Sequence, residues 1–213
     1  MHVEAGHPDG DHPLLNAAGR VLAAMGAEVV IHTQDDNLVR SRRPGDPGDA
    51  PFIVAAAGLP NLLHELVHVL QAGRLADDHG IDHSQIPYDL RRPEHRRILW
   101  DELSCCVISC AYLDEAQEAA WFAEQVGIQG VFYGHDDDPA AFLAAVDVAV
   151  ARHGDELEVV LAGAYAAVEA ALRGAGADAT LARPRARLAF APLWTRLRAT
   201  PNAAPGPTAP SAL

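Results

Sequence analysis

The feature that most constrains the fold is a short apolar segment, residues 61–71, that contains two histidines and a glutamate. Its order is Asn-Leu-Leu-His-Glu-Leu-Val-His-Val-Leu-Gln, with His64 and His68 four residues apart and Glu65 directly after the first histidine. The leucines and valines predict a largely buried helix. Such polar side chains are costly to bury unless they are paired or bind a metal ion. The fold must therefore provide partners for all three.

A helix would place His64 and His68 on one face, because residues four apart lie above one another. Their imidazole nitrogens can then meet at one point, where Glu65 can reach a water molecule. This is the arrangement of the zinc-binding HExxH motif, in which the glutamate is the general base. In a chain of this length and composition, the expected number of chance matches to the motif is roughly 0.03. The alternative is a pair of histidines that hydrogen-bond in the core or face solvent.

A second helix, predicted over residues 93–112, supplies a candidate third ligand. Its apolar residues trace one face, and Glu102 lies on that face. A carboxylate on a buried face needs a partner, and a metal ion held by the first helix would be that partner. We therefore predict Glu102 as the third metal ligand. Glu102 could instead pair with an arginine such as Arg91 or Arg96. The other candidate ligands in this part of the chain are Asp101, His79, His83 and His95.

The stretch His64-Glu65-Leu66-Val67-His68 resembles the active-site helix of the zincin metalloenzymes, most of which are peptidases. It does not resemble the metzincin branch, because Gln71 and Arg74 stand where that branch has glycine and histidine. With Glu102 on a later helix, the chain looks like the gluzincin branch. This resemblance implies a zinc ion and hydrolysis of a peptide or an amide-containing small molecule.

Hydrolysis of an amide also needs a hydrogen-bond donor for the developing oxyanion. Tyr133 and His135 are the predicted catalytic donors, beside a short strand or cleft wall at residues 131–133. Tyr88 and His95 are equal candidates by sequence.

Two further functions stay open. Two histidines and a carboxylate also form the facial triad of non-haem iron(II) oxygenases, so Fe2+ is the alternative metal and a biosynthetic tailoring oxidation the alternative reaction. The third interpretation is a non-catalytic zincin-like domain that acts in binding or sensing.

Composition restricts the partners. The formal net charge of −13 argues against nucleic acid or an anionic membrane surface as the main partner. All sixteen basic residues are arginine, which excludes a lysine Schiff base and a Walker-type phosphate loop. The sequence leaves the oligomeric state open.

The cysteines and the absence of a targeting segment predict a cytoplasmic protein. Cys105, Cys106 and Cys110 lie in one segment, and an odd, close-spaced set is not a disulfide framework. Cys106 and Cys110 could be soft metal ligands, although packing in the core is the favoured interpretation. We find no signal peptide and no apolar run long enough to span a membrane.

The predicted fold class is α+β and mostly helical, with a small sheet beside the two ligand-bearing helices. One domain is expected over residues 1–199, mobile over 1–13, followed by a disordered tail at 200–213. Arg183, Arg185, Arg187, Arg196 and Arg198 are expected on a solvated face or against an acidic partner. The predicted strands are 28–32 and 51–55, with a loop at 34–50. The predicted helices are 14–25, 60 onward, 93–112, 114–126, 140–152 and 156–172.

Overall fold

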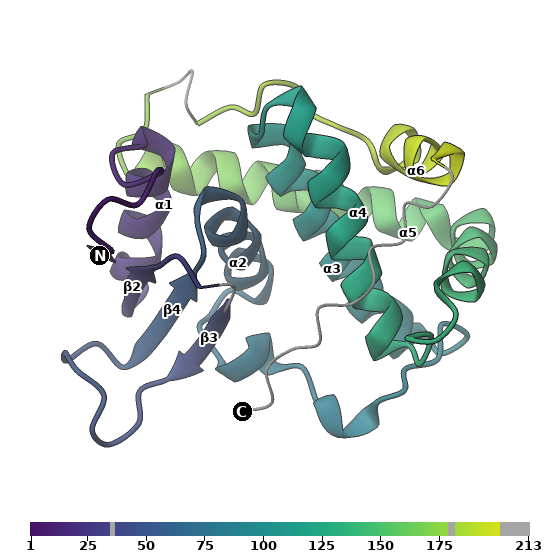
Figure 1. The fold of residues 1–213 in the computed structure, drawn as a ribbon, viewed down its shortest axis with the longest axis horizontal. Helices are drawn as coiled ribbons and strands as arrows, with labels where there is room; N and C mark the ends of the chain where they lie inside the picture. Colours follow the sequence, from purple (N-terminus) through teal and green to yellow (C-terminus); the bar gives the residue numbers. More distant parts are fainter. Residues whose placement is uncertain (35–36, 179–181, 201–213) are drawn as a thin grey trace.

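The structure is a computed structural model that describes residues 1–34, 37–178 and 182–200. It is mostly helical with one small sheet, which confirms the predicted class, and Figure 1 shows the sheet at one side of the helices. The strands are β1 (His2–Val3), β2 (Ala27–Ile31), β3 (Leu38–Ser41) and β4 (Phe52–Ala56). The helices are α1 (Pro13–Ala24), α2 (Leu59–Ala72), α3 (Pro93–Tyr112), α4 (Glu115–Phe132), α5 (Pro139–Gly174) and α6 (Phe190–Ala199). Two 3-10 turns, η1 (Asp77–Gly80) and η2 (His83–Gln85), follow α2.

The sheet has the order β1-β2-β4-β3, and only β3 runs antiparallel to its neighbour. Burial alternates along β2, where Ala27, Val29 and Ile31 are buried and the residues between them are partly exposed. This period of two is expected of a strand with one face toward a core. Helices α1 and α2 contact the sheet, and α2 also packs against α3.

Edge strand β3 was not predicted, because residues 34–50 read as a loop rich in aspartate, arginine, glycine and proline. Val39 is the one residue of β3 that is fully buried, so the strand carries almost no hydrophobic pattern. Its pairing with β4 defines it instead, from Leu38 opposite Ala55 to Ser41 opposite Phe52.

Helix α2 is positioned by its two ends. It begins after Gly58, whose φ of 157° lies in a region that other residues rarely adopt, and it ends at left-handed Gly73. The carboxylate of Asp9 accepts a hydrogen bond from the N–H group of Leu59 at 2.9 Å. Residues 1–13, expected to be mobile, thus contain strand β1 and a capping group for α2.

The later helices are longer than predicted. Helix α3 has the predicted bounds, but α4 continues to Phe132, so the predicted short strand at 131–133 is wrong. Helix α5 joins the two predicted helices across a kink at His153, where φ is −138°. The histidine and glycine between them bend the helix without ending it.

The C-terminal arginines lie on the expected solvated face, because all five are exposed: Arg183, Arg185, Arg187, Arg196 and Arg198. Four of them also pair with carboxylates of this chain. Arg185 and Arg196 both donate hydrogen bonds to Glu118, which is only 2% exposed. Arg187 binds buried Glu169 at 2.8 Å. A buried carboxylate needs such partners, and the sequence alone does not show where it is buried. The predicted tail, apart from Thr200, lies outside the described residues.

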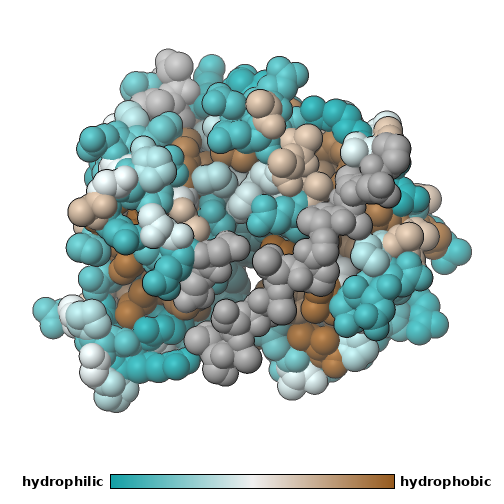
Figure 2. Space-filling model, viewed as in Figure 1, coloured by the Kyte–Doolittle hydropathy of each residue, from teal (hydrophilic) through white to brown (hydrophobic). Residues whose placement is uncertain are grey.

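The face drawn in Figure 2 is mainly hydrophilic. Among the described residues, no helix combines the length and the apolar character needed to cross a membrane.

Candidate metal centre

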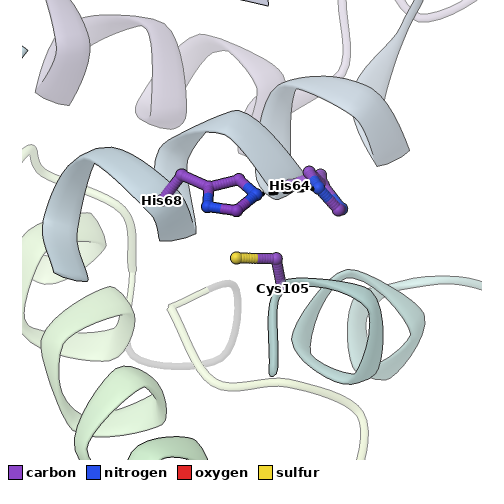
Figure 3. Close-up of side chains that lie close together, drawn as sticks. All are labelled: His64, His68 and Cys105. Atoms are coloured by element: carbon purple, nitrogen blue, oxygen red, sulfur yellow. Dashed lines mark hydrogen bonds between the residues drawn. The ribbon is translucent and has the colours of Figure 1, made fainter. Parts of the chain in front are cut away.

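His64 and His68 lie on the face of α2 that contacts α3. Their Nε2 atoms are 3.1 Å apart, and the two rings meet edge to face. Both residues are buried. Figure 3 shows the two rings in the space between the helices, with Cys105 reaching toward them from α3. The motif therefore does present two nitrogens to one point, as the helical spacing requires.

Glu102 reaches the same point from α3. Its Oε2 atom lies 3.5 Å from Nε2 of His64 and 3.3 Å from Nε2 of His68. Two ligands of a tetrahedral zinc ion bound at 2.0–2.1 Å are about 3.3 Å apart. The three atoms form a triangle of this size, and each offers an electron pair once the Nε2 protons of the histidines are displaced by the metal ion. The residues present therefore fit a zinc ion.

The charges at this point also suit a cation. Burial raises the pKa of Glu102, but the adjacent His68 and His64 outweigh it and hold the pKa well below its usual value, so the side chain is a carboxylate. Burial lowers the pKa of His68 below its usual value despite the same carboxylate. For His64, burial is outweighed by the hydrogen bond to Glu102, and the pKa is raised. A neutral His68 beside an ionised glutamate is ready to bind metal.

Gln129, on α4, holds the proposed third ligand. Its Nε2 atom donates a hydrogen bond to Oε2 of Glu102 at 3.1 Å, and the residue is 4% exposed. Outer contacts of this kind orient metal ligands. No motif in the sequence singles out this residue. The sequence does contain one sign of this role. Gln129 is a polar side chain one helical turn after Gln125 and Val126, on a helix face that is buried.

Cys105 is a second residue that the ligand prediction missed. Its Sγ atom and the ligand atoms of His64 and His68 all lie within 4.8 Å of one another. Cys105 is three residues after Glu102 and so shares its helix face, which was the available signal. The thiol now donates a hydrogen bond to Oε1 of Gln71 at 3.3 Å. The centre therefore offers two further donors beside the histidines, the carboxylate of Glu102 at 3.3–3.5 Å from their Nε2 atoms and the thiol of Cys105.

The other two cysteines are buried and free. Burial raises the pKa of Cys110 to about 12, and its Sγ atom faces the carbonyl oxygen of Glu118. These positions agree with packing, the favoured interpretation for them.

The side chain of Glu65 contacts His79 and not the triangle formed by His64, His68 and Glu102. Its Oε2 atom is 2.8 Å from Nε2 of His79, whose ring also stacks on His68 with centroids 4.3 Å apart. Burial raises the pKa of Glu65, but the hydrogen bond and charge of His79 outweigh it and lower the pKa below its usual value. Glu65 is therefore ionised, as a general base must be. His79, a candidate ligand by sequence, faces this base.

The remaining candidate ligands have other contacts. Asp101 pairs with Arg97 at 2.9 Å, four residues earlier on α3. The Nδ1 atom of His95 accepts a hydrogen bond from the N–H group of Asp89, and the ring of His83 lies against Phe132. The structure does not bring these three side chains into the triangle.

The predicted oxyanion donors are also engaged elsewhere. The hydroxyl of Tyr133 donates to the carbonyl oxygen of His95 at 2.6 Å, and that of Tyr88 to the carbonyl oxygen of Asp82. His135 lies against Phe142. Tyr88, Tyr133 and His135 line a separate cavity of about 650 Å³ together with Arg152 of α5. The structure thus groups them with each other and not with Glu65.

Among the residues that the structure describes, the ring of His64 lacks the hydrogen bond that usually orients a metal-binding histidine. The Nδ1 atom of His64 is buried and has no hydrogen-bond partner in the described part of the chain. A metal-binding histidine usually donates its second N–H group to a neighbour.

In comparisons with protein-family models, with curated proteins and with solved structures, this chain has no match. Its function is therefore argued from the geometry of the centre.

Proposed function

We propose that this chain is a zinc-dependent hydrolase of the peptidase or amidase type, with a zincin-like centre of the gluzincin kind. The observation that carries the proposal is the triangle of His64, His68 and Glu102, with an ionised glutamate on the residue after the first histidine. Two histidines, a glutamate and a free position are the ligand set of zinc hydrolases.

The donor atoms favour zinc over iron. Two imidazole nitrogens and a carboxylate suit both metals, but the thiol of Cys105 nearby is a soft donor, which favours zinc. A zinc ion held by these residues would lower the pKa of its bound water to about 7 and would polarise a carbonyl oxygen.

Glu65 has the proton-transfer role in this proposal. The carboxylate of Glu65 is ionised, and one of its oxygen atoms accepts a proton from the attacking water. The same atom then donates that proton to the leaving nitrogen of the amide, which yields a carboxylic acid and an amine. His64, His68 and Glu102 hold the ion, and Gln129 keeps Glu102 in place.

The test compares Glu65→Gln with the wild-type protein on a mixed library of short unstructured peptides. We expect the variant to keep about one zinc ion per chain and to lose at least about a hundredfold in cleavage rate, because the amide cannot accept the proton. New amino termini, measured by mass spectrometry, report cleavage. The matched control is Glu94→Gln, which removes an exposed carboxylate paired with Arg92. Equal cleavage by Glu65→Gln would contradict the role of Glu65.

One observation favours a second candidate, a closed site without catalysis. If the thiol of Cys105 completes the ligand set, four protein ligands leave no position for water. Cobalt substitution separates the two possibilities. A thiolate-to-cobalt absorption band in the wild-type protein that disappears in Cys105→Ser would indicate the closed site, and its absence in both proteins would indicate the open one.

A further inference from the structure

The candidate centre is closed to large molecules. The side chains of His64, Glu65, His68 and Glu102 are only 5–13% exposed. A peptide bond cannot reach Glu65 in this arrangement, so a covering segment has to move. The segment in contact with Glu65 is η1, which follows α2 and lies beside β3 in Figure 1.

The inner contact of this segment is His79. Its ring lies flat on that of His68, at an interplanar angle of 23°, and its Nε2 atom is hydrogen-bonded to Glu65. His79 thus occupies one oxygen of the proposed base and one face of a proposed ligand. Both contacts have to be lost before another molecule can occupy that place.

The outer contact is Asp77, which accepts a hydrogen bond from the N–H group of Ser41 in β3. In the pairing of β3 with β4, the N–H group of Arg42 bonds to the carbonyl oxygen of Pro51. Neighbouring residues of a strand alternate in direction, so the N–H group of Ser41 points away from β4. Asp77 therefore attaches η1 to the free edge of the sheet.

Little else holds the segment. None of residues 76–87 is buried, whereas Leu75 and Tyr88 on either side of them are. Asp78 and His79 have φ values of 45° and 56°, a left-handed conformation that is strained in residues other than glycine. Ile81 packs against the hydrophobic core but is only partly buried. A segment with no fully buried residue and a strained backbone has the properties of segments that open locally.

We propose that residues 76–81 form a lid over the centre, closed by Asp77 on β3 and by His79 on Glu65. Opening of this lid controls access to the metal ion and to the base. The access of substrate rests on the proposed function, but the lid itself is testable without any catalysis.

The experiment uses two variants that loosen the lid from positions away from the ligands. Asp77→Ala removes the outer contact. Asp78→Val keeps both contacts but places a β-branched residue at a φ of 45°, which disfavours the closed backbone. The matched control is Asp82→Ala. Within the described part of the chain, its exposed carboxylate bonds to Ser84 and Gln85 and not to β3 or Glu65.

Two rates are measured for each variant. Hydrogen exchange of the metal-free protein is measured at a hydrogen bond that each variant leaves in place. For Asp77→Ala this is the N–H group of Ile81, which donates to the carbonyl oxygen of Asp78 at 2.9 Å within the segment. For Asp78→Val it is the N–H group of Ser41, which donates to Asp77. The second measurement is the rate at which zinc-loaded protein transfers its metal to an excess of chelator. We expect both rates to rise about fivefold to tenfold in the two variants, a change equivalent to the loss of one ordinary hydrogen bond, and to stay unchanged in Asp82→Ala.

Unchanged exchange and zinc transfer in both variants would overturn the lid, as would an equal rise in Asp82→Ala. Faster exchange with unchanged zinc transfer would show a mobile segment that does not control access, which also contradicts the proposal. Absence of hydrolysis would refute the proposed function and leave these rates untouched. The two failures are therefore distinguishable.

Discussion

Gln129 acts on the centre through Glu102. The amide donates to Oε2, the same oxygen atom that faces both histidines, and Gln129 is itself buried on α4. Without this hydrogen bond, the long glutamate side chain can rotate away from His64 and His68.

We expect Gln129→Leu to weaken zinc binding by about 10- to 100-fold, the usual cost of losing an outer contact to a metal ligand. Leucine has a similar volume, so the core stays filled while the donor is lost. Competition with a chelator of known affinity measures the change. The control is Gln117→Leu on the exposed face of the same helix. Equal zinc affinity in wild type and Gln129→Leu would show that Gln129 does not orient Glu102.

At this scale the sequence predicts what depends on helical spacing and misses what depends on tertiary contact. The convergence of His64 and His68 follows from their spacing on one helix. The apolar face of residues 93–112 indicates that Glu102 is buried, but only the packing of α3 against α2 brings it to the histidines. The contacts of Gln129 and Cys105 arise from the packing of α2, α3 and α4 against each other. No local pattern encodes those distances.

At the scale of elements, the position of α2 determines where two of the three ligands lie. Its first turn has no side-chain cap of its own, and Asp9 from the N-terminal segment supplies one. Gly58 leaves room for this contact, because a Cβ atom there would lie 2.8 Å from the carboxylate of Asp9.

Asp9→Ala should lower the free energy of unfolding by about 1 kcal/mol, the typical value of a helix cap. For a chain of this size, the corresponding fall in melting temperature is about 2–4 °C. Thermal unfolding of the metal-free protein measures it. Asp11→Ala, two residues on and exposed, is the control. A melting temperature unchanged by Asp9→Ala would mean that the N-terminal segment does not hold α2.

Some helices and strands could be predicted from local sequence patterns, whereas others form only through tertiary contacts. The bounds of helices α1 and α3 were predicted within one residue. The apolar periodicity of α1 is clear, whereas α3 is buried on every side from Leu103 to Ala111. Strand β3 has one buried residue and forms through its pairing with β4. The continuity of α5 across Gly154 depends on its packing along α1, α2 and α3, which outweighs the weak local helix signal there.

At the scale of the whole molecule, the centre joins two parts of the chain. His64 and His68 come from α2, which packs on the sheet, whereas Glu102 comes from α3, which packs on α4 and α5. A zinc ion bound by both helices would therefore stabilise their contact. Ligand binding to the folded state alone contributes about 2.7 kcal/mol at a hundredfold excess over Kd.

The most direct test of the metal centre is elemental analysis of protein purified without added metal, alongside three variants. We predict about one zinc ion per chain in the wild-type protein and in Asp101→Asn, whose carboxylate pairs with Arg97. His64→Ala and Glu102→Ala should contain none. Absence of metal from the wild-type protein even after reconstitution, or loss of zinc in Asp101→Asn but not in Glu102→Ala, would contradict the assignment.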